Sequence, residues 1–347
     1  MPQEALLSVK ELRTEFFSSK TSSVTAIHNI SFDIYKGEIL GLVGESGCGK
    51  SVTSLSIMQL LKDTPGKITN GSAVLDGVNL VEASDDVIRD IRGGKMSMIF
   101  QEPMSALNPA MRIDHQMIET IRLHSDMNKE QAREHAAEML KKVGITDPQR
   151  VLKNYPHQLS GGMSQRVMIA MGLICHPKLL IADEPTTALD VTIQAQILEL
   201  MKELQKKTHM GIIFITHNLG VVAEICDKVS VMYAGKIVEQ GPVDDIFYKP
   251  GHPYTVGLLR SMPRVDAESY ERLIPIEGTP VDMLNPPEGC PFAPRCEHAM
   301  KICLQKMPPY VELGEGHRSA CWLRVQDQLD KAGQEKPVQD QEVSGRE

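Results

Sequence analysis

The sequence predicts an α/β fold built around a phosphate-binding loop. Residues 44–51 read Gly-Glu-Ser-Gly-Cys-Gly-Lys-Ser and fit the pattern G-x-x-x-x-G-K-[S/T] at every fixed position. An apolar run at 39–43 precedes this loop and a helix-like stretch at 52–61 follows it, which is the strand-to-helix context that the pattern requires. Further short apolar runs alternate with helical patterns downstream, as expected for a sheet covered by helices.

The loop residues suit the phosphates of a nucleotide. Glycines at three positions allow a tight turn in which successive backbone N–H groups point at an anion. Lys50 is expected to reach the β- and γ-phosphates, and the Ser51 hydroxyl to bind Mg²⁺. A glycine-rich turn carrying Lys-Ser by chance is the alternative, and the flanking strand and helix argue against it. The expected nucleotide contacts are Gly44, Glu45, Ser46, Gly47, Cys48, Gly49, Lys50, Ser51 and Val52.

Composition excludes several classes of protein. The formal net charge of −8 leaves no basic excess to neutralise a nucleic-acid backbone, so no nucleic-acid partner is expected. The longest apolar stretch, Val167 to Cys175, is far shorter than the roughly 20 residues of a membrane-spanning helix. The first residues contain no apolar core of a signal peptide, so a cytosolic chain with reduced cysteines is expected.

The N-terminal quarter reads as strands. Residues 6–17 and 24–34 alternate apolar and polar side chains, which predicts two antiparallel strands. An aromatic at the end of the first strand, Phe16 or Phe17, would suit stacking on adenine, although position alone fits an edge or core aromatic equally well. A further strand is expected at 71–80, with Asp76-Gly77 as its turn signal.

The middle of the chain combines helices with polar strand ends. A short strand at 95–100 ends in Gln101, and polar residues at strand ends face the nucleotide in such sheets. A helical insertion follows at about 103–160, and it contains a helix from the N-cap Asn128, with Gln131 as its capping-box partner, to Val143. The run Leu-Ser-Gly-Gly-Met at 159–163 then opens another helix.

Two later strands also end in polar residues. The strand at 178–182 leads into Asp183-Glu184, an acidic pair suited to a magnesium ligand and a general base. The strand at 211–216 ends in His217, and Asp190 precedes a helix that runs to about residue 206. A lone histidine at a strand end is more often structural than catalytic.

Taken in order, these motifs resemble the nucleotide-binding subunit of an ATP-binding-cassette (ABC) transporter. The runs from Gly161, from Ala182 and from His252 are similar, more narrowly, to an ATPase subunit of bacterial oligopeptide/dipeptide importers, and that similarity reaches Leu323. The resemblance implies a P-loop NTPase cassette over 5–240, with a RecA-like core, an antiparallel β subdomain and a helical subdomain. A small Cys/Pro-rich extension would cover 241–323, and the charged composition of 324–347 predicts a disordered tail.

The resemblance also implies roles for the motif residues. Gln101 and Asp183 would organise Mg²⁺ and the attacking water, Glu184 would accept its proton, and His217 would hold the γ-phosphate. Two subunits would face head to tail, so that ATP bound by one chain is covered by the motif of the other. That covering motif is Ser160, Gly161 and Gly162, with Asp190 across the dimer interface.

Partners follow from the same resemblance. They are a second ABC ATPase subunit, which is a paralogue in close relatives, two transmembrane permease subunits and, indirectly, an extracytoplasmic peptide-binding protein. The chain would then lie on the cytoplasmic face of the membrane. Cargo stays open between peptides and other solutes such as nickel or glutathione. A soluble ABC ATPase acting on DNA or ribosomes is the other class considered, but such proteins carry a long coiled coil or two cassettes.

Four of the seven cysteines lie close together in the Pro-rich segment. Four thiolates there suit a metal or cluster that cross-links a region with little core of its own. Zinc is a poorer match because its usual C-x2–4-C knuckles are missing, and chance clustering of thiols is the alternative. Some relatives carry an iron–sulfur cluster on this motif, which implies a [4Fe–4S] centre. The four residues are Cys290, Cys296, Cys303 and Cys321.

Overall fold

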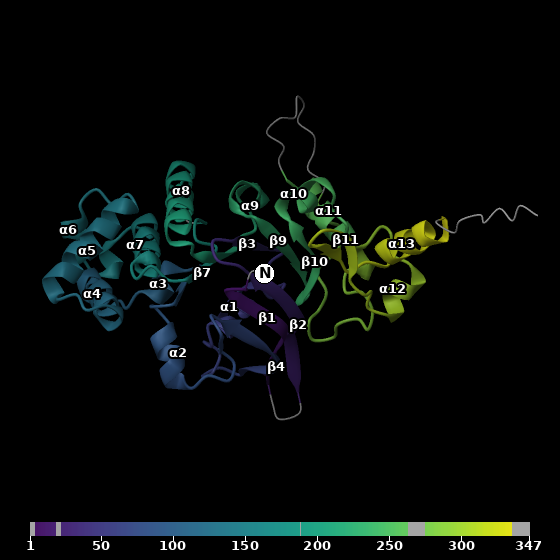
Figure 1. The fold of residues 1–347 in the computed structure, drawn as a ribbon, viewed down its shortest axis with the longest axis horizontal. Helices are drawn as coiled ribbons and strands as arrows, with labels where there is room; N and C mark the ends of the chain where they lie inside the picture. The colour runs from purple at the N-terminus through teal and green to yellow at the C-terminus, as the bar shows by residue number, and fades with distance from the viewer. Residues whose placement is uncertain (1–3, 19–21, 188, 263–274, 335–347) are drawn as a thin grey trace, which may run out of the picture.

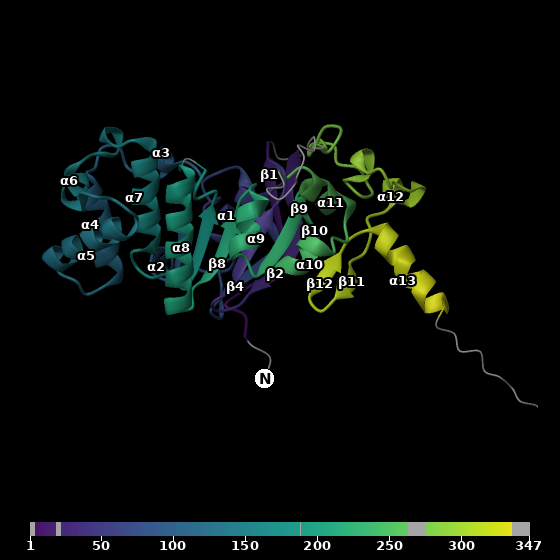
Figure 2. The same cartoon turned by 90° about the horizontal axis from the view of Figure 1, so that it is seen from above.

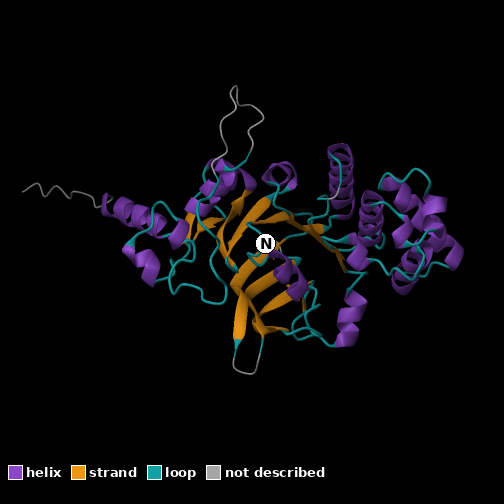
Figure 3. Ribbon diagram, turned by 180° about the vertical axis from the view of Figure 1, so that it is seen from behind, coloured by secondary structure: helices purple, strands orange, loops and turns teal. Residues whose placement is uncertain are grey.

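The computed structural model describes residues 4–18, 22–187, 189–262 and 275–334. The molecule is elongated: a group of helices forms one end, two sheets form the middle, and the C-terminal extension forms the other end (Figure 1). The strands lie between helices at both ends when the molecule is seen from behind (Figure 3). An α/β fold is therefore confirmed.

The main sheet has a parallel centre. Its strand order is β11-β12-β10-β9-β3-β8-β7-β6, and the five strands from β9 to β6 run parallel. Strands β3, β7 and β8 are buried along their whole length, as expected where both faces of a parallel sheet are covered. The bounds are β3 Ile39–Val43, β6 Met96–Ile99, β7 Leu179–Asp183, β8 Gly211–Ile215, β9 Lys228–Tyr233 and β10 Lys236–Pro242.

The second sheet is antiparallel, in the order β2-β1-β4-β5. The two predicted N-terminal strands are confirmed as β1 (Leu7–Phe17) and β2 (Ser23–Ile34), which pair antiparallel. The single strand expected at 71–80 is wrong in its bounds. A hairpin of β4 (Gly66–Leu75) and β5 (Val78–Asn79) occupies this region, because Asp76 and Gly77 both have positive φ and reverse the chain.

Alternating side chains of the main sheet enter two different cores. In β8, Ile213 and Ile215 face the antiparallel sheet, whereas Ile212 and Phe214 pack with the helices. A strand puts successive side chains on opposite faces, so five residues of one strand connect both cores. The polar strand ends that follow are thereby held on a rigid base.

Helices surround the main sheet. The predicted capping box is confirmed: Asn128 Oδ1 accepts from the N–H groups of Glu130 and Gln131, and Gln131 Oε1 accepts from Asn128 N, each at 3.0 Å. The cassette helices are α1 Lys50–Ile57, α2 Asp85–Ile91, α3 Pro103–Ala106, α4 Ile113–His124, α5 Lys129–Lys142, α6 Pro148–Lys153, the 3-10 turn η1 Pro156–Gln158, α7 Gly161–Leu173, α8 Val191–Thr208 and α9 Leu219–Ile225, followed by α10 Val243–Tyr248 and α11 Pro253–Arg260.

The C-terminal extension is joined to the main sheet. Its strand β12 pairs with β10, and the buried Glu239 carboxylate on β10 accepts from Gly251 N, His252 N and His317 Nε2. The extension therefore folds as a continuation of the cassette. Its elements are η2 Ala293–Arg295, α12 Lys301–Gln305, β11 Val311–Gly314, β12 His317–Ser319 and α13 Trp322–Gln334.

The expected disordered tail is wrong over its first residues. Residues 324–334 belong to α13, which lies at the opposite end of the molecule from α4–α7 (Figure 2). A polar composition does not prevent helix formation here, because the segment contains Ala, Leu, Gln and Lys, which have good helix propensity. Residues 335–347 lie outside the described part. No helix within the described ranges has the length and apolar character needed to cross a bilayer.

Candidate functional site

The predicted site residues meet at one edge of the main sheet. The phosphate loop follows β3, His217 follows β8, Asp183 ends β7 and Gln101 follows β6. These four strands are neighbours and run parallel, so their carboxyl ends open at the same edge. Segments from Gly44 to His217 are brought together in this way.

The phosphate loop requires glycine where the chain passes close to its neighbours. A Cβ on Gly44 would lie 2.2 Å from Met232 O, and one on Gly49 would lie 2.9 Å from Ala26 O. Gly49 is the N-cap of α1, where no side chain caps the helix and no acidic residue lies in the first turn. The N–H groups at this end are therefore available for an anion.

Lys50 is held inside the loop. Its side chain is buried, and Nζ donates to Gly44 O at 2.8 Å and to Glu45 O at 2.9 Å. In the part of the chain that the structure describes, Lys50 forms no ion pair with a carboxylate. A buried ammonium that is bonded to two carbonyls and, at 3.7 Å, to the Cys48 Sγ favours the approach of an anionic ligand.

Asp183 has the character of a cation ligand. It is buried at the end of β7, and its Oδ1 has no hydrogen-bond partner. Burial raises the pKa of its carboxyl and the charge of Glu184 raises it further, whereas Ser51 and Lys50 act in the opposite direction. A buried carboxylate oxygen without a partner is costly, and a divalent cation shared with the Ser51 hydroxyl would satisfy it. These residues therefore fit Mg²⁺.

Three side chains contact the carboxylate of Glu184. Gln101 Nε2 lies 3.4 Å and Thr187 Oγ1 3.1 Å from Oε2, and His217 Nδ1 lies 3.1 Å from Oε1. The backbone of Glu184 has a positive φ of 48°, and its N–H donates to Ile215 O at 2.9 Å. A strained backbone held in this way is typical of functional sites. Thr187 was missed from the sequence, although its place in the Asp-Glu-Pro-Thr-Thr run is a usable signal.

The Ser-Gly-Gly motif does not reach the phosphate loop of its own chain. Ser160 and Gly161 are exposed at the start of α7, and Ser160 Oγ accepts from Met163 N at 3.4 Å. Asp190 caps α8 in the same way, with Oδ1 accepting from Ile193 N at 3.0 Å. Among the described residues, no hydrogen bond joins either motif to residues 44–51.

Phe16 and Phe17 both end β1 and are half-buried. The Phe16 ring lies against Gly66, and Lys67 Nζ lies 5.8 Å from the centroid of the Phe17 ring. Stacking of adenine on one of these two rings stays a prediction.

Two further residues contact the phosphate loop from the C-terminal side. Arg295 forms a double hydrogen bond with the Glu45 carboxylate, at 2.6 Å to Oε2 and 2.9 Å to Oε1. The Tyr254 hydroxyl accepts from Glu45 N at 2.8 Å. No local pattern marks either residue as part of the site, because the contacts span 250 and 209 positions of the chain.

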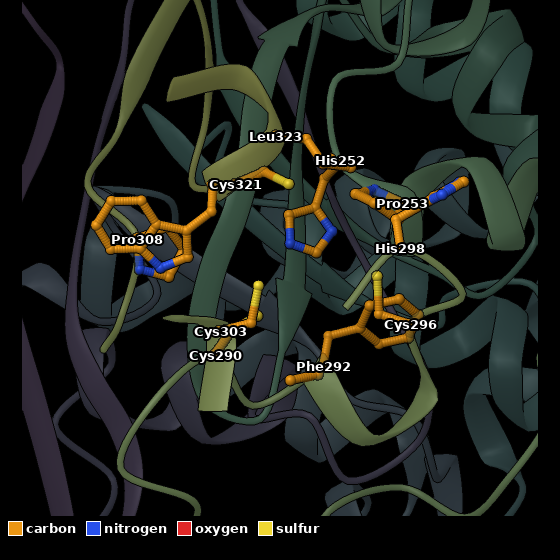
Figure 4. Close-up of a pocket in the computed structure, with 12 residues that line it drawn as sticks. His252, Pro253, Cys290, Phe292, Cys296, His298, Cys303, Pro308, Cys321 and Leu323 are labelled. Atoms are coloured by element: carbon orange, nitrogen blue, oxygen red, sulfur yellow. The ribbon is translucent and has the colours of Figure 1, made fainter. Parts of the chain in front are cut away.

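The four clustered cysteines line one cavity, together with His252, Phe292 and His298 (Figure 4). Burial raises the pKa of Cys290 to about 11 and also raises the pKa of Cys296 and Cys321. Across the described ranges, no three His, Cys, Asp or Glu side chains stand in the arrangement of a metal site. The residues share a cavity and supply four sulfur donors, which is the donor set of a cluster.

Comparison with protein families identifies two regions of the chain. Residues 27–187 match the model described as ABC transporter, and residues 238–303 match the model described as oligopeptide/dipeptide transporter, C-terminal region. The first match includes Gln101, Asp183 and Glu184, and the second includes three of the four clustered cysteines.

Curated relatives are similar over nearly the whole chain. The dipeptide transport ATP-binding protein DppD of Bacillus subtilis is 54% identical over 93% of this chain and 96% of its own length. The oligopeptide transport ATP-binding protein OppD of Escherichia coli is 49% identical, over 94% and 95%. A solved dimeric ABC cassette bound to ADP and Pi is 27% identical with a TM-score of 0.62, covering 68% of this chain and 98% of that one.

Proposed function

The chain belongs to the ABC transporter family, among the ATP-binding proteins of oligopeptide and dipeptide transport, and we propose on this premise that it powers peptide import. It is an ATPase. The observation that carries its chemistry is the convergence of Gln101, Glu184 and His217 beside the phosphate loop. Phosphoryl transfer depends mainly on positioning and on stabilisation of charge, which such a convergence supplies.

ATP would lie on the phosphate loop. Its phosphates would accept from the N–H groups at the start of α1 and from Lys50, whose ammonium would leave the carbonyls of Gly44 and Glu45. The adenine would stack on Phe16 or Phe17 at the end of β1. Asp183, Ser51 and Gln101 would hold Mg²⁺, which neutralises developing phosphate charge when it is bound.

Hydrolysis would use Glu184 as the general base. Water attacks the γ-phosphorus, its proton passes to the Glu184 carboxylate, and the bond from the γ-phosphorus to the bridging oxygen of ADP breaks. Gln101 and Thr187 orient that carboxylate through Oε2. His217 meets Oε1 with Nδ1, which leaves Nε2 as the ring nitrogen that would contact the γ-phosphate. The products are ADP and phosphate.

The working unit would be a dimer of ATPase subunits. The exposed Ser160-Gly161-Gly162 turn opens α7 and does not contact its own phosphate loop, so it is free to cover ATP bound on a facing chain. Asp190 would lie at the same interface. On the family resemblance we take a paralogous subunit as the partner, giving a heterodimer.

Import also requires proteins that cross the membrane. When the two ATPase subunits close over ATP, their motion would pass to two permease subunits. An extracytoplasmic binding protein would deliver the peptide to these permeases. The chain would sit at the cytoplasmic face as a peripheral subunit. Cargo contacts would lie on those partners, so a related importer of nickel or glutathione is the alternative.

We also propose that the cysteine cavity holds a [4Fe–4S] cluster. Four thiols from separate segments open into one cavity, and burial raises the pKa of three of them, Cys290, Cys296 and Cys321, so binding as thiolates would require these to lose protons that burial favours. The cluster would cross-link the extension, since the segments that bear Cys290 and Cys303 meet there through one backbone hydrogen bond of 2.7 Å. Zinc on the same four thiols is the alternative.

Uptake of labelled dipeptides and oligopeptides by cells that lack this subunit tests the cargo. We expect uptake to be lost and to return with the wild-type chain but not with Glu184→Gln. Unchanged peptide uptake, with loss of nickel or glutathione uptake, would contradict peptide import and leave the ATPase intact.

A further inference from the structure

The phosphate loop is held at its second residue by the C-terminal extension. Glu45 donates its backbone N–H to the Tyr254 hydroxyl, and its carboxylate accepts two hydrogen bonds from Arg295. Its carbonyl accepts from Lys50 Nζ at 2.9 Å. The N–H and the carboxylate of Glu45 are therefore bonded to the extension, and its carbonyl is bonded to the lysine that would bind phosphate and to Cys48 N at 3.3 Å.

Arg295 is itself fixed by several contacts. Only 4% of its side chain is exposed, against 28% for Glu45. Beyond Glu45, its guanidinium donates to Tyr233 Oη at 3.4 Å and to the carbonyls of Glu277 and Ile276 at 3.0 and 3.2 Å. A planar guanidinium bound on all sides transmits displacement of its backbone to the carboxylate that it holds.

Arg295 lies in a short segment whose residues Cys290, Phe292, Ala293 and Cys296 line the cysteine cavity. Residues 290–296 run from one clustered cysteine to the next, and Arg295 ends the 3-10 turn η2 between them. Phe292, in the same turn, lines the cavity (Figure 4) and packs against Tyr233 and Tyr254, each at 5.3 Å between ring centroids. One short segment thus contacts the cavity on one side and the supports of Glu45 on the other.

We propose that Arg295 is a positioning residue of the ATP site. Through this residue, the way in which the cavity thiols are held sets the affinity of the phosphate loop for ATP. This inference rests on the ATP site of the proposed function. The segment 290–296 carries Arg295 and two of the four cavity thiols, Cys290 and Cys296, so a change in how these thiols are held moves the guanidinium. Glu45 then moves with it, and so does the carbonyl that competes with phosphate for Lys50. Such coupling between two sites is reciprocal.

Nucleotide affinity of the full chain tests the ion pair. We would measure equilibrium binding of a fluorescent ATP analogue to wild type, Arg295→Gln, Glu45→Gln and the double variant, with no turnover required. Each single change is expected to weaken binding about tenfold, and the double change no more than either single one, since both remove the same contact. Arg295→Lys should recover part of the loss.

Arg324→Gln is the matched control, because Arg324 also lies in the extension but donates to Gly251 O and pairs with Asp327. Its affinity should equal that of wild type. Wild-type affinity in Arg295→Gln and Glu45→Gln would overturn the coupling alone. A wild-type chain that binds no ATP analogue would overturn the ATPase function and this coupling with it.

Because the coupling is reciprocal, ATP binding should also affect the cysteine cavity. This effect gives a second measurement, which would not change if Arg295 had only a structural role. In protein from which any bound cluster has been removed, alkylation of Cys296, followed by mass spectrometry, should slow severalfold when ATP is bound to wild type, because bound ATP fixes Glu45 and hence the cavity wall. In Arg295→Gln at saturating ATP, this protection should be absent. Equal protection in both proteins would overturn the proposal.

Discussion

The edge of the main sheet and the cysteine cavity are built in opposite ways. At the sheet edge, Gln101 and His217 already meet Glu184 through polar side-chain contacts. In the cavity, the thiols come from loops and short helices, and one of them, Cys303 of α12, accepts from the backbone N–H of Met300 at 3.4 Å. The first region holds its polar side chains in mutual contact, whereas the second brings together four thiols, and burial raises the pKa of three of them, Cys290, Cys296 and Cys321.

This difference shows which interactions keep each region in a fixed conformation. Parallel strands fix the sheet edge, because their hydrogen bonds and two packed faces allow little movement. The cavity depends on loops around an apolar interior, and a bound group would order it. We therefore expect changes at the sheet edge to affect turnover, and changes at the cavity to affect the extension first. The predictions below run from the largest expected effect on ATP turnover to the smallest.

The largest effect is expected for Glu184→Gln. The amide cannot accept a proton from water, so turnover should fall by about 10²–10⁴-fold while ATP affinity is kept. Steady-state hydrolysis and nucleotide binding measure the two quantities. Glu224→Gln, a change at an exposed residue of α9, is the control and should hydrolyse ATP normally. Near-normal turnover of Glu184→Gln would contradict the expectation that changes at the sheet edge, rather than at the cavity, affect turnover.

The composite site predicts a dependence on concentration. Each ATP needs the Ser-Gly-Gly turn of a facing chain, so the hydrolysis rate per chain should rise with protein concentration until dimers saturate. A related partner ATPase should raise it further. The measurement is a dilution series at saturating ATP. A full rate per chain that is independent of concentration would contradict the composite site.

Thr187→Val should have a moderate effect. It removes the hydroxyl that lies 3.1 Å from Glu184 Oε2 and leaves Gln101 and His217 in place. The loss of one such hydrogen bond to a charged group corresponds to about tenfold in rate, seen as a lower kcat with little change in KM. Thr187→Ser keeps the hydroxyl and is the matched control. Equal rates for the two variants would show that Glu184 is positioned without Thr187.

Cys296→Ser should change turnover least. If the cavity holds a [4Fe–4S] cluster, anaerobically purified wild type should contain iron and acid-labile sulfide, and the variant should lose both. ATP affinity should fall only a few-fold, because Arg295 itself remains, while the segment after Gly241 becomes sensitive to protease. Cys175→Ser, on the other side of the cassette, is the control. Iron-free wild type with unchanged protease resistance in Cys296→Ser would mean that packing alone holds the extension.

Sequence by itself determined the features whose residues are contiguous. The phosphate loop, its flanking strand and helix, and the capping box of α5 depend on neighbours along the chain, so their patterns are readable without a structure. The family resemblance also named Gln101, Glu184 and His217, which the structure brings within hydrogen-bonding range. The prediction of disorder was wrong for residues 324–334, because composition describes average solvation and not the propensity of one short helix.

Only the tertiary structure decided how the two regions are connected. Pairing of β12 with β10 makes the extension part of the main sheet, and no periodicity of either strand encodes that partner. The contact from Arg295 to Glu45 joins positions 250 residues apart, and a lone arginine in a Pro-rich segment carries no signal for it. Long-range pairs of this kind exist because the folded cores bring two surfaces together, and the geometry of those cores is a property of the whole chain.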